Sequence, residues 1–184
     1  PMLLQPHDFA EDGRSENFLN LGKSHEVAYP TGGQIHYAAL NQRDQSFLQY
    51  VLKDHPSSVH LLANAVPCVT PPALVKTTTS NSGIPDNLYL YPVRAVRRKN
   101  LGELALLSAS HPEIHFANSL GPTNPSFQTT YEEWKAFGKS LDLSLTYGLG
   151  EQSNESFLEL VQQAASIINV SVAEGFGLGF LEPW

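Results

Sequence analysis

The chain has 184 residues, of which 41% are hydrophobic and 16% charged, a composition typical of an ordered globular protein of one to two domains. Its net charge of −7, with 11 Lys and Arg residues, argues against nucleic-acid binding, because phosphate backbones require many clustered cations. The single cysteine, Cys68, excludes an intramolecular disulfide and a cysteine-based metal cluster. No apolar run approaches the ~20 residues that span a bilayer. We therefore expect a cytoplasmic protein, or one peripheral to a membrane.

The first third of the chain indicates one alternating α/β unit. Strands are expected at residues 2–5, 34–40 and 58–62, and helices at 15–23 and 43–54. Within the second helix, apolar residues recur at three- to four-residue spacing and predict a buried face. These residues are Phe47, Leu48, Val51 and Leu52.

A change of composition predicts a boundary between two domains. Residues 67–86 are rich in Pro, Thr, Ser and Asn and lack hydrophobic periodicity, as in an exposed linker. Residues 1–66 would then form the later part of an amino-terminal α/β domain, and residues 87–184 a second domain. The chain opens on a strand-like segment and stops at Trp184, just after the expected start of a helix. We expect a fragment, truncated at both ends.

Strands and helices alternate regularly in the second domain. The expected strands are at residues 87–91, 113–117, 142–147 and 167–172, and the expected helices at 99–110, 129–140, 154–165 and from 177. This order predicts an α/β fold with a Rossmann-like parallel sheet and helices on both faces. Ligands of such sheets bind at the carboxyl ends of the strands. The loops at those ends are residues 92–100, 120–126 and 173–177.

The loop after the fourth of these strands is glycine-rich and carries two carboxylates. Gly175, Gly177 and Gly179 fall at the opening of a helix, where bare backbone and free amides favour an anion. Glu174 and Glu182 are separated by seven residues, about two helical turns. They could accept hydrogen bonds from the hydroxyls of an extended nucleotide sugar. The alternative is a capping glutamate followed by a surface glutamate.

The loop after the first strand carries a basic cluster. Arg94 and Lys99 lie five residues apart between a strand and a helix, with Arg97 and Arg98 between them. In an acidic protein, such a cluster suits a small anionic ligand better than a polyanion. Two fixed cations would stabilise a diphosphate leaving group. The alternative is a solvated start of a helix.

Taken together, these motifs resemble those of GT-B-fold retaining glycosyltransferases of the large family-4-like group, also called glycosyl transferases group 1. The resemblance rests on Arg94 and Lys99 after one strand and on residues 174–182 about eighty residues later. It extends over residues 7–14, 91–100 and 122–125, which are similar to a bacterial subgroup. The second domain would then be the donor-binding domain.

The resemblance implies a role for each matching residue. Arg94 and Lys99 would bind the donor diphosphate. Glu174 would contact the transferred sugar, and Glu182 the ribose of the nucleoside. His7, after the first strand, resembles a histidine presented to the sugar, although a histidine in this position also suits loop packing. The backbone amides that would approach sugar and phosphate are those of Gly175, Phe176, Gly177 and Leu178.

The expected function is transfer of a hexose from a nucleotide sugar to a glycan, lipid or small-molecule acceptor. The donor is a substrate, and neither a cofactor nor a metal is required. Two alternatives remain open. One is a nucleotide-sugar-binding or assembly module without turnover, which would form homo-oligomers through its truncated surfaces. The other is a GT-B sugar-nucleotide epimerase, which would share the fold and the anion site.

Other residue groups predict no site. The seven histidines are scattered, and Pro112 places His111 and His115 in a turn into a strand instead of on one helix face. Tyr131, Trp134 and Phe137 share helical spacing and are expected to pack in the core instead of stacking on a sugar.

Overall fold

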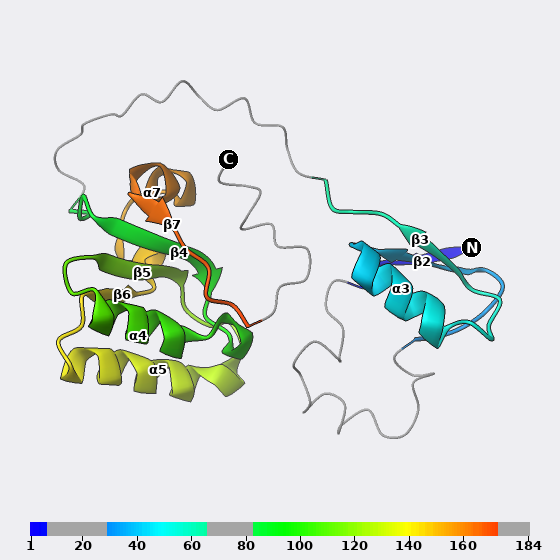
Figure 1. The fold of residues 1–184 in the computed structure, drawn as a ribbon, viewed down its shortest axis with the longest axis horizontal. Coiled ribbons are helices and arrows are strands. Elements are labelled where there is room, and N and C mark those ends of the chain that lie inside the picture. The colour runs from blue at the N-terminus through cyan, green and yellow to red at the C-terminus, as the bar shows by residue number, and fades with distance from the viewer. Residues whose placement is uncertain (7–28, 66–82, 173–184) are drawn as a thin grey trace. The chain divides into compact units, whose positions relative to one another are not determined.

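A computed structural model describes residues 1–6, 29–65 and 83–172. The described residues fall into two compact units (Figure 1). The predicted helix at 15–23, most of the predicted linker and the predicted helix from 177 lie outside the described residues.

The amino-terminal unit contains a three-stranded parallel sheet in the order β1-β2-β3. Its strands are β1 (Met2–Leu4), β2 (Ile35–Ala39) and β3 (Ser58–Leu61), and helix α3 (Gln42–Val51) packs against β2 and β3. Asn41 caps the helix, because its side-chain oxygen accepts a hydrogen bond from the amide of Asp44 (2.9 Å). The predicted apolar face is confirmed, with Leu48 and Leu52 buried and Phe47 and Val51 packed beside them.

The carboxyl-terminal unit contains a four-stranded parallel sheet in the order β6-β5-β4-β7. The strands are β4 (Leu88–Arg94), β5 (His115–Leu120), β6 (Leu145–Tyr147) and β7 (Ser166–Ile167). The helices are the 3₁₀ turn η1 (Arg97–Lys99), α4 (Leu101–Ser110), α5 (Pro125–Ser140), α6 (Leu149–Gln152) and α7 (Phe157–Gln163). The predicted α/β fold with parallel strands flanked by helices is confirmed.

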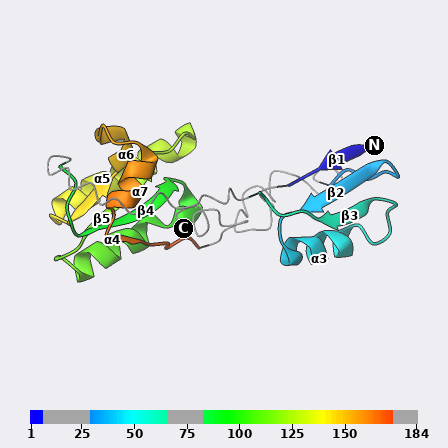
Figure 2. The ribbon, with the colours of Figure 1, turned by 90° about the horizontal axis from the view of Figure 1, so that it is seen from above.

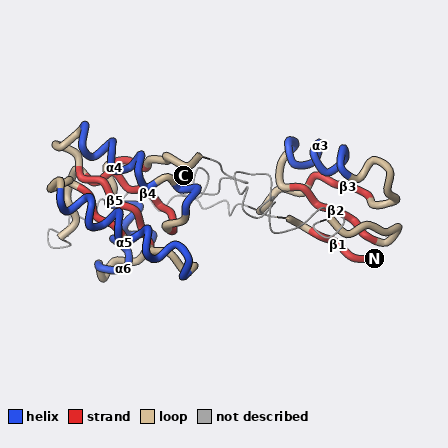
Figure 3. The backbone as a smooth tube through the Cα atoms, turned by 90° about the horizontal axis from the view of Figure 1, so that it is seen from below, coloured by secondary structure: helices blue, strands red, loops and turns tan. Residues whose placement is uncertain are grey.

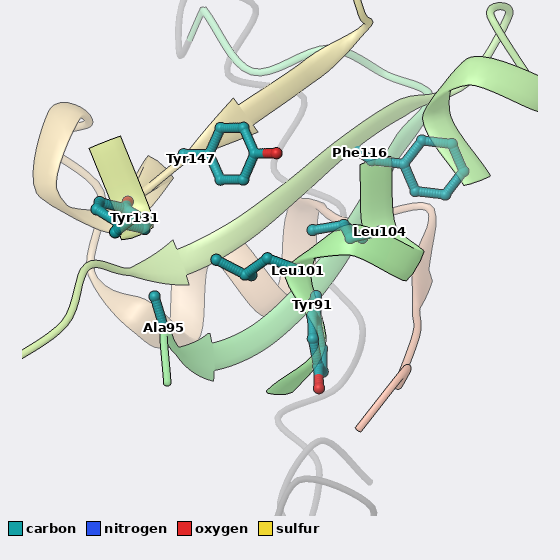
Figure 4. Packing of buried hydrophobic residues seen from close by; sticks show 7 residues of the cluster. All are labelled: Tyr91, Ala95, Leu101, Leu104, Phe116, Tyr131 and Tyr147. Atoms are coloured by element: carbon teal, nitrogen blue, oxygen red, sulfur yellow. The ribbon is translucent and has the colours of Figure 1, made fainter. Parts of the chain in front are cut away.

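Helices cover both faces of the second sheet. Figure 2 shows α7 over β4 on one face, and Figure 3, from the opposite side, shows α4 and α5 in front of β4 and β5. Because side chains alternate along a strand, Leu88 and Leu90 pack with Leu160 of α7, whereas Tyr91 packs on the other face. The buried cluster on the α4 and α5 face is drawn in Figure 4 and consists of Tyr91, Ala95, Leu101, Leu104, Phe116, Tyr131 and Tyr147.

The aromatic residues of α5 mostly confirm the expected packing. Tyr131 is buried, and Trp134 packs against the same cluster, so close to α4 that a Cβ at Gly102 would lie 3.0 Å from the indole ring. Phe137 is about half exposed, at 48%.

Several boundaries differ from the predicted ones for local reasons. Helix α5 begins at Pro125 instead of 129, because Asn124 caps it by accepting a hydrogen bond from the amide of Ser126 (3.0 Å). Strand β6 begins at 145 instead of 142, because Asp142 adopts a left-handed conformation (φ 50°) that ends α5. The predicted helix at 154–165 is the shorter α7, and α6 precedes it.

Candidate functional site

The strand order of the carboxyl-terminal sheet defines a topological switch point. From β4 the chain adds β5 and then β6 on one side, and later returns to place β7 on the other side of β4. Helix α4, which follows β4, and helix α7, which precedes β7, therefore pack on opposite faces of the sheet. In open α/β sheets, ligands bind in the crevice at the point where the strand order reverses.

The basic turn follows β4 at this switch point. The register of β4 against β5 shifts between Tyr91 and Arg94, and the amide of Ala95 donates to the carbonyl of Leu120 (2.8 Å), which anchors the turn to β5. Arg94 is exposed, and Asn100 (φ 50°) redirects the chain into α4. The amino terminus of α4 therefore lies at the same edge of the sheet as the cations, which are Arg94, Arg97, Arg98 and Lys99.

The segment after β7 is attached to β4 largely by side chains. The amide of Ile168 donates to the carbonyl of Leu90 (3.0 Å). The buried hydroxyl of Tyr91 then donates to Asn169 Oδ1 (3.4 Å) and hydrogen-bonds Ser171 Oγ. Asn169 Oδ1 also accepts the amide of Ser171 (2.8 Å). The strand predicted at 167–172 is therefore shorter, at Ser166–Ile167, and the residues after it are held by these hydrogen bonds instead of by regular strand pairing.

This segment meets the basic turn directly. The amide of Val172 donates to the carbonyl of Arg98 (2.9 Å). The backbone that leads into the glycine-rich loop is thus joined to the 3₁₀ turn between Arg94 and Lys99.

The structure therefore locates Arg94 and Lys99 at either end of one turn at the switch point. The other predicted site residues lie outside the described residues, and their roles stay predictions. These are His7, Glu174, Gly175, Phe176, Gly177, Leu178 and Glu182.

The loops after β5 and β6 form a second polar cluster that sequence reasoning missed. The carboxylate of Glu151 accepts the amide of Gly121 (2.9 Å). Gly148 has φ 72°, and a Cβ there would lie 2.9 Å from both Glu151 Oε2 and the hydroxyl of Tyr131. Burial, and next the charge of Glu151, raise the pKa of Tyr131 to about 12. The sequence offered one signal for this cluster, because Gly148 directly follows the strand predicted at 142–147.

Asn118 connects these two loops from within the sheet. Its side chain is fully buried, donates to the carbonyl of Leu120 (2.8 Å) and accepts the amide of Gly148 (3.2 Å). The carboxyl ends of β5 and β6 are therefore held together by internal hydrogen bonds.

A shallow pocket of about 350 Å³ lies along β6, between α5 and α6. Its lining includes Lys135, Lys139 and Tyr147. Because β5 separates β6 from β4, this pocket is not at the switch point.

The expectation for His111 and His115 is confirmed. His111 caps the end of α4, and His115 is the first residue of β5. The two ring nitrogens of His115 hydrogen-bond Thr146 Oγ1 (2.9 Å) and Ser144 Oγ (3.3 Å), and burial lowers its pKa.

Within residues 1–6, 29–65 and 83–172, no group of three or more His, Cys, Asp or Glu side chains could hold a metal ion. The helices found in the same residues are too short or too polar to cross a membrane.

Comparison with known proteins relates the chain to glycosyltransferases. No family model matches it. The chain is 27% identical over 197 residues to mannosylglucosyl-3-phosphoglycerate synthase of Petrotoga mobilis, an alignment that covers 99% of this chain and 38% of the relative. The chain thus spans less than half the length of that protein.

A solved structure shares the fold. The pneumococcal O-GlcNAc transferase GtfA, determined in complex with UDP and GlcNAc, matches with a TM-score of 0.55 and 15% identity. The match covers 80% of this chain and 28% of GtfA.

Proposed function

We propose that this chain supplies the donor-binding part of a GT-B glycosyltransferase, and that a nucleotide sugar binds at the switch point between β4 and β7. The carrying observation is that the basic turn after β4 and the segment after β7 meet through the bond from the Val172 amide to the Arg98 carbonyl. The likeness to two glycosyltransferases supports the reaction class.

In this proposal, Arg94 and Lys99 neutralise the diphosphate of the donor. The negative charge on the leaving oxygens grows as the bond to the sugar breaks, so fixed cations stabilise the transition state more than the bound substrate. The amino terminus of α4, at the same edge of the sheet, adds a favourable dipole. Glu174 and Glu182 would hold the sugar and the ribose, and His7 would contact the sugar.

The proposed transfer needs neither a separate base nor a metal. The bond between the anomeric carbon and the diphosphate oxygen breaks, and the acceptor hydroxyl oxygen bonds to that carbon with retention of configuration. The departing phosphate oxygen takes the acceptor's proton. The protein positions the reactants and neutralises charge.

Isothermal titration calorimetry of the full-length protein tests this proposal. UDP is the first probe, because the structural neighbour was determined with it. Arg94→Ala combined with Lys99→Ala should weaken binding at least tenfold, about 1.4 kcal/mol. The charge-matched control is Lys135→Ala with Lys139→Ala beside the β6 pocket, which should change affinity less than about twofold.

Two outcomes would overturn the proposal in different ways. If neither UDP nor any other nucleoside diphosphate binds the wild-type protein, the donor site is wrong. If the Arg94 and Lys99 double variant binds as tightly as wild type, the assignment of these two cations is wrong.

A further inference from the structure

Two histidines lie side by side on the sheet of the amino-terminal unit. His36 is on β2 and His60 is on β3, and the register of these strands pairs Ala38 with His60. Since side chains alternate along a strand, His36 shares a face with Ala38 and therefore with His60. Tyr37 lies between His36 and Ala38 on β2, so its side chain points to the other face, where it belongs to the cluster packed against α3. The two imidazoles therefore occupy the face opposite α3.

The facing ring nitrogens have the spacing of two ligands on one metal ion. His36 Nδ1 and His60 Nε2 are 3.2 Å apart, with ring centroids 5.5 Å apart and planes at 29°. Two nitrogens bound tetrahedrally to Zn²⁺ at about 2.0–2.1 Å are separated by about 3.3 Å. A metal ion could therefore replace the shared proton if each ring turns so that its nitrogen lone pair points at the ion instead of at the other ring.

We propose that His36 and His60 form a two-histidine site for a divalent transition metal ion of the Zn²⁺, Cu²⁺ or Ni²⁺ class. Neutral imidazole is a preferred ligand of these ions, and both side chains come from hydrogen-bonded strands whose backbone fixes their spacing. His60 is exposed, so an ion has access to the pair, and water completes the coordination.

The site would join the outer strand of the sheet to its neighbour. β3 pairs with β2 on one side and is last in the strand order of this sheet. An ion that binds the folded pair and not the unfolded chain stabilises the folded state by mass action. Zinc should therefore raise the thermal unfolding temperature of the amino-terminal unit.

Titration of the full-length protein with ZnCl₂ in a non-chelating buffer tests the site. Each of His36→Ala and His60→Ala should weaken the affinity at least tenfold, and the double variant should be little worse than either, because one histidine alone does not chelate. His55→Ala, an exposed histidine in the loop before β3, is the matched control and should leave affinity unchanged. Equal zinc affinity in wild type and the double variant would overturn the proposal.

A spectroscopic measurement keeps the test valid if an alanine variant folds poorly. His60→Gln keeps a polar side chain opposite His36 but removes the imidazole. The electron paramagnetic resonance spectrum of bound Cu²⁺ should show coupling to two imidazole nitrogens in wild type and to one in His60→Gln. An unchanged spectrum in His60→Gln would show that His60 is not a ligand. This result does not depend on whether the protein binds a nucleotide.

Discussion

The two halves of the carboxyl-terminal sheet use polar groups in opposite ways. At the ends of β5 and β6, the carboxylate of Glu151 and the side-chain amide of Asn118 hydrogen-bond to neighbouring loops of the protein itself. At the ends of β4 and β7, the backbone and Tyr91 hold the segments in place while the exposed cation Arg94 extends from the turn. Internally satisfied loops give rigidity, whereas charge at a switch point favours a ligand. This difference is the reason for proposing that the ligand binds at the ends of β4 and β7.

The largest effect is expected from a substitution in the loops at the ends of β5 and β6. Gly148→Ala should destabilise the protein by about 2–4 kcal/mol, because a Cβ there combines a left-handed backbone with contacts of 2.9 Å to Glu151 and Tyr131. Gly83→Ala is the matched control: its φ is 68° but nothing lies within 4 Å of the added Cβ, so only backbone strain of about 1 kcal/mol is expected. Urea unfolding measures both, and equal losses would contradict the steric account.

A smaller effect is expected at the ends of β4 and β7, where the ligand is proposed to bind. Tyr91→Phe removes the hydroxyl that bonds Asn169 and Ser171, and should cost about 1–2 kcal/mol in unfolding free energy. It should also weaken UDP binding several-fold, because the segment after β7 loses the side-chain hydrogen bonds that fix Asn169 and Ser171 against β4. Tyr89→Phe on the same strand is the control and should leave UDP affinity unchanged. Loss of stability with full UDP affinity would limit Tyr91 to a structural role.

The smallest expected effect concerns pH. Burial lowers the pKa of His115, so the folded protein favours the neutral imidazole, whereas the unfolded chain takes up a proton near the usual value of about 6.5. The stability contributed by neutral His115 is therefore present above pH ~6.5 and lost as the pH falls toward the lowered value. His115→Gln should reduce the fall in unfolding free energy between pH 7 and 5. Parallel losses in variant and wild type would rule out His115 as the cause.

Much of this fold could be predicted from the sequence because burial sets the periodicity. The leucines and tyrosines of residues 88–91 pack on the two buried faces of β4, and the strand predicted at 87–91 matches most of β4, which continues to Arg94. The start of α5 was missed by four residues although Asn124 and Pro125 carry the expected capping chemistry. Helix α6 has four residues and is too short to show a periodic pattern.

The candidate site was predictable in part. The clustering of Arg94 and Lys99 is visible in the sequence because both lie in one turn. The role of Tyr91 is not visible, because a tyrosine in a strand indicates a core residue and its partners lie 78 and 80 residues away. The switch point itself depends on the side of β4 to which β7 is added, and local sequence does not specify that choice.

The ligand is proposed to bind where β4 and β7 end. Backbone amide chemical shifts of the isotope-labelled full-length protein, recorded during titration with UDP, test this proposal most directly. We predict that the largest changes fall at residues 94–102 and 168–172, with small changes around the β6 pocket at residues 135–152. Changes concentrated at 135–152, with none at the basic turn, would contradict the account.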